Sequence, residues 1–116
     1  MIPIIVLLGC ALLIGALSLP MIRGWVPPNG LYGFRTPATL ASEALWYPAN
    51  RYAGWQMLYA AIAQLLGVLA LFLLADGLPE PVILLAGLVL LTVTLLVAVV
   101  RSFRYLNRLQ EDRDRT

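Results

Sequence analysis

Three long apolar runs, separated by two polar connections, dominate the pattern of hydrophobic and polar positions along the chain. Residues 2–22 and 54–75 are almost unbroken apolar sequence, and residues 82–103 form a third run that is dense in leucine and valine. Because about 20 apolar residues span the hydrocarbon core of a bilayer, each run is long enough to cross a membrane as a helix. The pattern therefore predicts an all-α membrane protein with three transmembrane helices in a single domain, residues 1–116.

The longer connection, residues 23–53, contains the start signal of a short helix. Thr36 is a good N-cap, and Pro37 fits the first helical position because its missing N–H has no intrahelical partner there. We expect this helix to lie at the membrane interface, where its aromatic residues reach headgroup depth. It is predicted to run to about Tyr47, because Pro48 stops it.

The ends of the other elements follow from single residues and from short turn signals. Asn50 is expected to cap the second spanning helix, and Pro20 is expected to kink or end the first. Residues 76–81 are rich in turn residues, so the second and third helices are predicted to form an antiparallel pair. The third helix is expected to leave the membrane and to continue into a cytoplasmic tail, residues 104–116, whose end at residues 111–116 is frayed.

Composition supports a membrane location and changes the meaning of the net charge. The chain is 61% hydrophobic and 12% charged, whereas about 25% of the residues of a soluble domain are charged. The net charge of +2 would suit nucleic acid, but the positions of the arginines indicate membrane topology instead. Five of the eight arginines follow the last apolar run: Arg101, Arg104, Arg108, Arg113 and Arg115.

The distribution of charge between the connections predicts the orientation. The remaining arginines lie in residues 23–53, and the short turn carries only acids, Asp76 and Glu80. Because positive loops stay in the cytoplasm, we expect a multi-pass membrane protein with a defined orientation. Its N-terminus is predicted to be outside, its C-terminus in the cytoplasm, and it is expected to make no direct contact with nucleic acid.

A single cysteine, Cys10, and the absence of histidine limit the chemistry of the chain. One cysteine forms no internal disulfide, and a zinc or haem site without histidine lacks its usual ligands, so we expect no metal and no cofactor. The residues around Cys10 resemble a lipoprotein cleavage box. No positive leader precedes them, so we interpret Cys10 as part of the first spanning helix.

Small residues recur at spacings of three and four in the second apolar run, which places them on one helix face. Ala60, Ala63 and Gly67 would let a neighbouring helix approach closely, and Gln56 and Gln64 lie on or beside the same face. Two interpretations remain open for the amides: hydrogen bonds between helices, or the lining of a transport path. Transport would require a homo-oligomer, because three helices enclose little pore.

The longer connection also holds the polar side chains best suited to bind a partner. Glu43 is its only acid, so an ion pair with Arg35 or Arg51 is one way to hold these charges near apolar surface. Alternatively, the arginines present paired donors to an anionic partner. The candidate partner-binding residues are Asn29, Arg35, Thr36, Thr39, Glu43, Trp46, Asn50 and Arg51. Catalysis has weak support, because a lone carboxylate without histidine supplies no acid–base pair.

The same stretch resembles the signature of the SdpI family, bacterial membrane proteins named for immunity to a secreted sporulation-delaying toxin. The family pattern is roughly P-N-x-x-x-G-x-R-T-P-x-T-L, followed by W and then by N-R-x-x-G. It is matched by Pro28, Asn29, Gly33, Arg35, Thr36, Pro37, Thr39, Leu40, Trp46, Asn50, Arg51 and Gly54. The resemblance is to the C-terminal part of the founding member, which has additional spanning helices before this region.

The resemblance implies immunity and signalling, that is, protection from a toxic peptide and capture of a repressor protein at the membrane. We therefore predict a protein of the bacterial inner membrane, embedded in membrane lipid, that binds an antimicrobial peptide or a repressor protein through residues 28–55. One alternative is a small homo-oligomeric transporter or channel subunit. A second alternative is a membrane enzyme that acts on lipid or peptide, with Glu43 as its acid or base.

Overall fold

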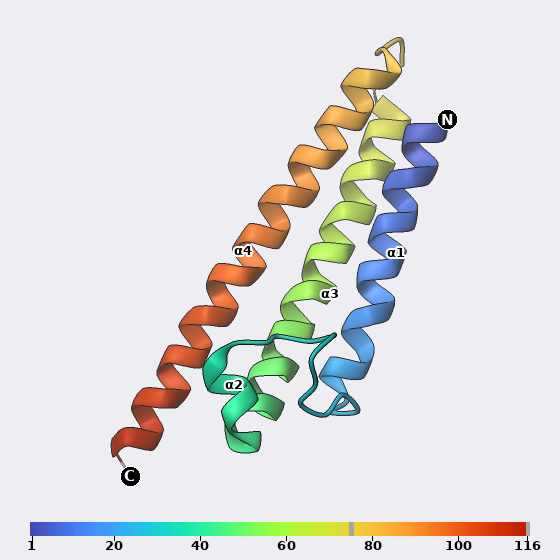
Figure 1. Cartoon of the computed structure of the whole chain (residues 1–116). Coiled ribbons are helices and arrows are strands. Elements are labelled where there is room, and N and C mark those ends of the chain that lie inside the picture. The colour runs from blue at the N-terminus through green and yellow to red at the C-terminus, as the bar shows by residue number, and fades with distance from the viewer. Residues whose placement is uncertain (75, 116) are drawn as a thin grey trace.

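Three long helices and one short helix make up the fold. The computed structural model describes residues 1–74 and 76–115, so Ala75 and Thr116, which belong to the predicted helix 54–75 and tail 104–116, lie outside the described residues. The helices are α1 (Ile2–Ile22), α2 (Pro37–Ala41), α3 (Glu43–Leu74) and α4 (Glu80–Arg115) (Figure 1). α1, α3 and α4 are each long and apolar enough to cross a membrane. The predicted fold class, three spanning helices and a short helix in the first connection, is confirmed.

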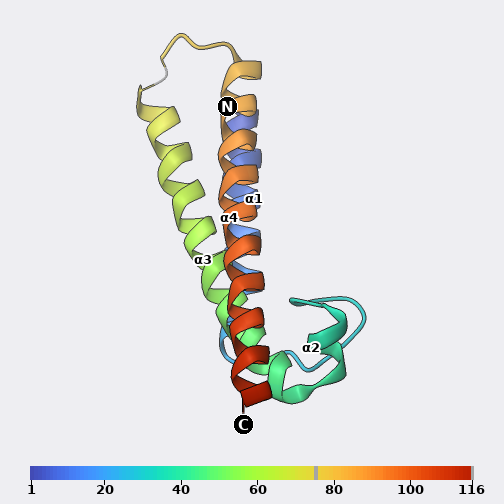
Figure 2. The same ribbon diagram turned by 90° about the vertical axis from the view of Figure 1, so that its left-hand side faces the viewer.

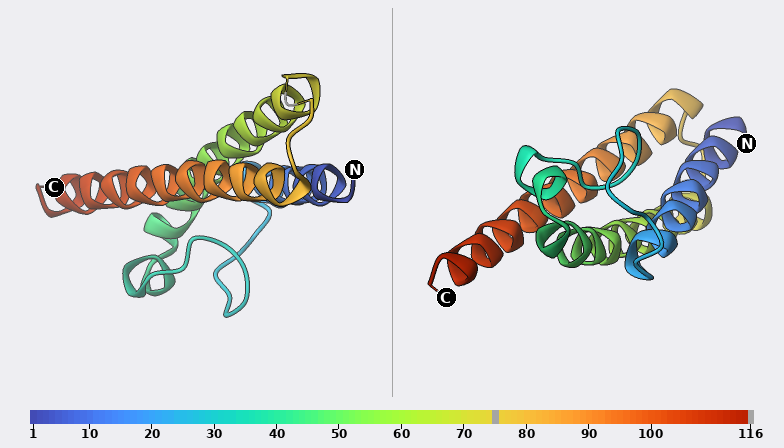
Figure 3. Two further views of the ribbon diagram at one scale, coloured as in Figure 1. Left: turned by 90° about the horizontal axis from the view of Figure 1, so that it is seen from above. Right: turned by 60° about the horizontal axis from the view of Figure 1, so that its bottom comes forward.

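α3 lies at the centre of the molecule, and α1 and α4 both pack along it. The N-terminus and the turn at residues 76–79 lie at one end, which we call the turn end (Figures 1 and 2). The loop, α2 and the C-terminal end of α4 lie at the other, which we call the loop end. α1 and α4 are close at the turn end and diverge toward the loop end, where the loop crosses the space between them (Figures 1 and 3).

Two glycines allow the close packing of the three long helices. A Cβ atom on Gly87 would lie 2.2 Å from a methyl carbon of Leu7, and one on Gly67 would lie 2.1 Å from a methyl carbon of Leu90. Both distances are far below van der Waals contact, so a larger residue would displace a neighbouring side chain. Gln64 links α3 to α4 by donating Nε2–H to the Gly87 carbonyl at 3.2 Å. Its Oε1 is buried and has no partner among the described residues.

α1 ends in a turn that requires glycine. The N–H of Gly24 bonds to the Met21 carbonyl at 3.3 Å, and the N–H of Trp25 bonds to the Pro20 carbonyl at 3.0 Å. This is the Schellman pattern, which satisfies free carbonyls at a helix end and favours a residue with positive φ. Gly24 supplies a φ of 72°. Pro20 lies inside α1, which ends soon afterwards at Ile22.

The prediction for the boundary between the short helix and the second spanning helix is wrong. α2 stops early because Ser42 is extended, and the Ser42 carbonyl accepts the first N–H groups of the next helix. α3 then begins at Glu43 and continues through Pro48, so Asn50 lies inside a helix rather than at its cap. The N–H that Pro48 lacks would have bonded to the carbonyl of Ala44, an exposed residue. Burial of the side chains around Pro48 offsets the loss of this one bond.

The prediction of a frayed end at residues 111–116 is also wrong for residues 111–115, because they form the last part of α4. Leu106 is buried against Leu45 of α3. Arg113 donates a hydrogen bond to the Ser42 hydroxyl at 2.9 Å. The end of α4 is therefore helical because it packs on the start of α3, a partner that the mixed charge of this segment does not reveal.

Candidate functional site

The first two turns of α3 hold the backbone of the loop through side chains on one helix face. Trp46 is fully buried and donates its indole N–H to the Val26 carbonyl at 2.7 Å. Asn50 is 1% exposed; its Oδ1 accepts the Phe34 N–H at 2.7 Å, and its Nδ2 donates to the Phe34 carbonyl at 3.3 Å. Because residues four apart share a helix face, both side chains reach the loop from the same side of α3.

Arg51 and Gly54 fix α3 against the end of α1. Arg51 Nε donates to the Ile22 carbonyl at 3.2 Å, where the negative end of the α1 dipole favours a cation. A Cβ atom on Gly54 would lie 2.9 Å from Ile22 Cγ1 and 3.0 Å from the Ile22 backbone nitrogen. The two residues therefore act together: glycine brings the helices close, and the arginine satisfies a carbonyl of the helix end beside it.

Two local features give the loop its shape. Asn29 closes a turn, because its Oδ1 accepts the N–H groups of Leu31 at 2.9 Å and Tyr32 at 2.8 Å, while its Nδ2 donates to two carbonyls of the same turn. Gly33 has a φ of 118°, and a Cβ atom on it would lie 2.7 Å from Asn50 Oδ1. The loop therefore passes α3 at a point that leaves no room for a side chain.

Thr36 and Thr39 cap the start of α2 reciprocally. The Thr39 N–H donates to Thr36 Oγ1 at 3.1 Å, and the Thr36 N–H donates to Thr39 Oγ1 at 2.8 Å. This is a capping box in which threonine replaces the usual Glu or Gln, and Thr36 is confirmed as the N-cap. The Thr39 hydroxyl lies 3.0 Å from the Phe34 carbonyl, to which it donates. α2 is thus tied to the same segment that Asn50 holds.

Most of the predicted partner-binding residues have their polar atoms engaged inside the protein: Asn29, Thr36, Thr39, Trp46, Asn50 and Arg51. Arg35 and Glu43 are exposed, and neither has a hydrogen bond or an ion pair with another described residue. The ion pair predicted for Glu43 is not formed. Glu43 and Arg51 are separated by about 12 Å along the axis of one helix, and Arg51 binds a carbonyl instead.

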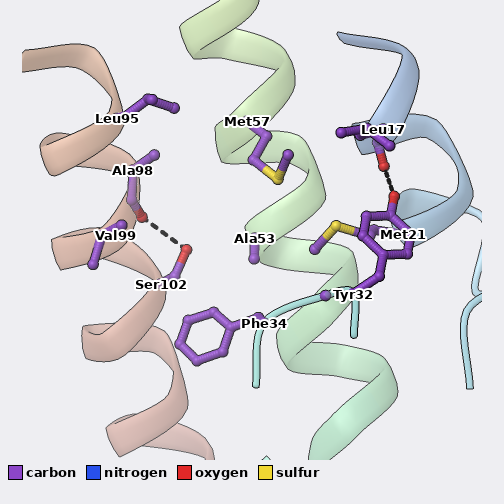
Figure 4. Close-up of a pocket in the computed structure, with 11 residues that line it drawn as sticks. Leu17, Met21, Tyr32, Phe34, Ala53, Met57, Leu95, Ala98, Val99 and Ser102 are labelled. Atoms are coloured by element: carbon purple, nitrogen blue, oxygen red, sulfur yellow. Dashed lines mark hydrogen bonds between the residues drawn. The ribbon is translucent and has the colours of Figure 1, made fainter. Parts of the chain in front are cut away.

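An apolar cavity of about 290 Å³ lies beside the segment of the loop that Asn50 holds (Figure 4). Tyr32, Gly33 and Phe34 close it at the loop end. Its hydroxyl groups, those of Tyr32 and Ser102, donate to the carbonyls of Leu17 and Ala98. The cavity therefore offers apolar surface with its hydroxyl donors already engaged. Its walls come from all three long helices: Leu17, Met21, Ala53, Met57, Leu95, Ala98, Val99 and Ser102.

One hydroxyl of the loop has a shifted pKa, and two exposed charges lie on or beside the loop. Burial raises the pKa of the Tyr32 hydroxyl above its ordinary value, so this group remains a protonated donor at neutral pH. Over residues 1–74 and 76–115, no group of three His, Cys, Asp or Glu side chains is placed to hold a metal ion. Arg35 and Glu43, the charges without partners, are suited to ion pairs with another molecule.

The tryptophan, asparagine, arginine and glycine that organise this loop are at the spacing of the SdpI signature. A model of the SdpI/YfhL protein family matches residues 25–100, a span that includes the loop, α2, α3 and most of α4. The chain belongs to this family. No curated protein and no solved structure matches it. In this SdpI/YfhL protein, Trp46, Asn50, Arg51 and Gly54 support the loop from behind.

Sequence reasoning missed the residues that line the cavity. A signal existed for Tyr32 and Phe34, two aromatic residues on either side of a glycine in a polar stretch, where packing against the bundle is the simplest use of their rings. Phe34 also lies with its ring centroid 5.1 Å from that of Phe103. No comparable signal existed for Met57 or Leu95, since each is one apolar residue within an apolar run. Only the tertiary arrangement separates side chains that face the cavity from those that face lipid.

Proposed function

We propose that this SdpI/YfhL protein binds an amphipathic peptide or protein partner at its loop end, in an immunity or signalling role. The observation that carries the proposal is the apolar cavity closed by Tyr32 and Phe34. An apolar side chain of the partner would fill the cavity, in the way that buried anchors dominate protein interfaces. Arg35 follows Phe34 directly and is free to pair with an acidic group of the same partner.

The internal hydrogen bonds of the loop support this proposal. A loop that is ordered before its partner arrives loses less conformational entropy when it binds. Trp46, Asn50 and Arg51 supply that order through bonds to loop and helix-end carbonyls. In this role they position the binding surface and do not touch the partner.

We also propose that the protein lies in the bacterial inner membrane with its loop end in the cytoplasm. The arginines gather at the loop end, whereas Asp76 and Glu80 lie at the turn end, and positive segments remain in the cytoplasm. In this orientation a toxic peptide would reach the cavity from within the bilayer, and a repressor would reach Arg35 and Glu43 from the cytoplasm.

A survival assay with paired substitutions tests the binding role. The full chain is expressed in a bacterium that is sensitive to the secreted sporulation-delaying toxin, as wild type, as Leu95→Trp or as Leu96→Trp. Leu95 lines the cavity, whereas its neighbour Leu96 is 59% exposed and does not. We expect wild type and Leu96→Trp to protect equally. Leu95→Trp should lower the tolerated toxin concentration about tenfold, because a filled cavity loses at least ~1.4 kcal/mol of binding.

Replacing the exposed Arg35 should lower the tolerated toxin concentration by a smaller factor. Arg35→Ala should lower the tolerated concentration about threefold, since an exposed ion pair contributes only up to ~1 kcal/mol. Membrane levels of all variants are compared by immunoblot. Equal survival with and without the wild-type protein would rule out immunity, and equal survival of the two tryptophan variants would rule out the cavity as the binding surface.

A further inference from the structure

A second hollow lies on the other side of the seam between α3 and α4 from the cavity in Figure 4. Its volume is about 270 Å³, and Ala98, at the seam, lines both hollows. We call it the seam groove, and it is separate from the proposed partner site. Its lining includes Gln56, Tyr59, Ala60 and Ala63 of α3 and Val97 and Arg101 of α4.

Gln56 is a mostly buried residue whose amide group makes no hydrogen bond with another described residue. It is only 7% exposed, and it lines the seam groove. The carboxamide of Gln64, two turns along the same helix, differs because it donates to the Gly87 carbonyl. Gln56 therefore lines the groove with a donor and an acceptor that no described residue uses.

The groove is polar at one end and apolar at the other. α3 and α4 are antiparallel, so Gln56 and Arg101 both line the groove at its loop end, while Ala63 and Val93 line it nearer the middle of the helices. Arg101 is exposed and makes no hydrogen bond or ion pair with another described residue. Tyr59 stands beside the polar end, and aromatic rings of this kind mark headgroup depth. The Arg101 cation and the Gln56 amide thus lie at the depth expected for the membrane interface, and the apolar part of the groove, which we call the channel, continues from them toward Ala63.

We propose that the seam groove binds a phospholipid with an anionic head group. The Arg101 guanidinium and the Gln56 carboxamide bind the phosphate, and one acyl chain lies along the channel between Ala60 and Val97. Charge complementarity decides the occupant, because the lipid supplies an anion for Arg101 and an apolar chain for the channel at the correct depths.

A second copy of this chain satisfies these groups less well. The spanning segments of α1, α3 and α4 are almost entirely apolar at this depth, so a helix seated in the groove would cover Gln56 and Arg101 without pairing them. Leaving a buried charge and a buried amide unpaired is unfavourable. A phospholipid pairs both groups and also fills the apolar part of the groove.

Native mass spectrometry of the purified full chain tests the proposal with two defined lipids, phosphatidylglycerol and phosphatidylcholine. The wild type should bind one phosphatidylglycerol more tightly than phosphatidylcholine. Arg101→Gln should weaken phosphatidylglycerol binding about tenfold, as expected for the loss of a charge-assisted hydrogen bond. Ala63→Leu, which fills the channel, should weaken both lipids. The matched control is Arg104→Gln, an exposed arginine on the same helix that does not line the groove.

Gln56→Leu provides a second route if Ala63→Leu fails to fold, as judged by circular dichroism and gel filtration. It keeps the side-chain volume, removes the amide and should weaken phosphatidylglycerol binding severalfold. Equal binding of the two lipids by the wild type overturns the proposal, as does an equal loss in Arg101→Gln and Arg104→Gln. A change in dimer fraction in Ala63→Leu with unchanged lipid binding would assign the groove to a second copy and also overturn it.

Discussion

Asn50 hydrogen-bonds the backbone of the loop segment that crosses α3, as a neighbouring strand would do in a β-sheet. Its carboxamide bonds to both the N–H and the carbonyl of Phe34, so a backbone without a sheet partner is still satisfied. From the sequence alone, Asn50 and Trp46 were predicted to bind an external partner. An amide or an indole N–H has the same appearance in a sequence whether it binds a ligand or a carbonyl of its own chain.

Replacing Asn50 should therefore destabilise the protein rather than only weaken binding. Asn50→Ala leaves the partly buried Phe34 N–H without its partner, and the Phe34 carbonyl keeps only the Thr39 hydroxyl as a donor. The free energy of unfolding is expected to fall by about 1–3 kcal/mol. Thermal unfolding in detergent, followed by circular dichroism, measures the change. Limited proteolysis should show faster cleavage within the loop.

Asn107→Ala is the matched control at the residue scale. Asn107 is exposed on α4 and has no hydrogen bond with another described residue, so its replacement should leave the unfolding midpoint almost unchanged. Equal midpoints for the two variants would show that Asn50 does not support the loop, and its polar atoms would then be available to a partner.

At the scale of elements, the lengths of the apolar runs predicted the three long helices, whereas the local start and stop signals misplaced the start of α3. Each of the three apolar runs forms a spanning helix, and Thr36 caps the short helix as expected. The start of α3 was misplaced because Pro48 ordinarily ends a helix, but here tertiary burial of Trp46 and Asn50 outweighs one lost bond. The helical end of α4 at residues 111–115 was missed because Arg113 bonds to Ser42, which is far away in sequence.

The stability of the protein should be sensitive to one added methyl group where α1 and α3 are in contact at the loop end. Gly54→Ala places a Cβ atom within 3.0 Å of the Ile22 backbone, and backbone yields less readily than a side chain. We expect a loss of about 1–3 kcal/mol in stability from the displaced helices. Unfolding in detergent measures it.

Gly9→Ala is the comparison for this element. No atom lies within 4 Å of the position that a methyl group on Gly9 would occupy, so alanine there should be neutral or slightly stabilising through its higher helix propensity. A neutral Gly54→Ala would mean that α1 and α3 are not in close contact at this point.

The whole molecule is asymmetric between its two ends. Tryptophan and tyrosine occur only in the loop-end part of the chain, at residues 25, 32, 46, 47, 52, 55, 59 and 105. Tyr52 and Tyr105 stack with ring centroids 4.3 Å apart, joining α3 to α4 in this region. Aromatic residues of this kind favour the headgroup layer. One membrane interface is therefore marked strongly at the loop end and hardly at all at the turn end.

Cysteine labelling tests the proposed orientation of the whole molecule. In a Cys10→Ala background, Leu78→Cys at the turn end should react with a membrane-impermeant maleimide in intact spheroplasts. Asp112→Cys at the end of α4 should react only after permeabilisation, because the arginines retain that end in the cytoplasm. The reversed labelling pattern would place the loop outside and remove the repressor from the set of partners.

The divergence of α1 and α4 also affects the surrounding bilayer. The two helices meet at the turn end and separate toward the loop end, where the loop and α2 add further bulk (Figures 1 and 3). Because the loop and α2 have no counterpart at the turn end, we expect the protein to displace more lipid from the leaflet on the loop side than from the other leaflet. Accumulation of many copies would expand the loop-side leaflet relative to its partner and impose a curvature on the membrane that contains them.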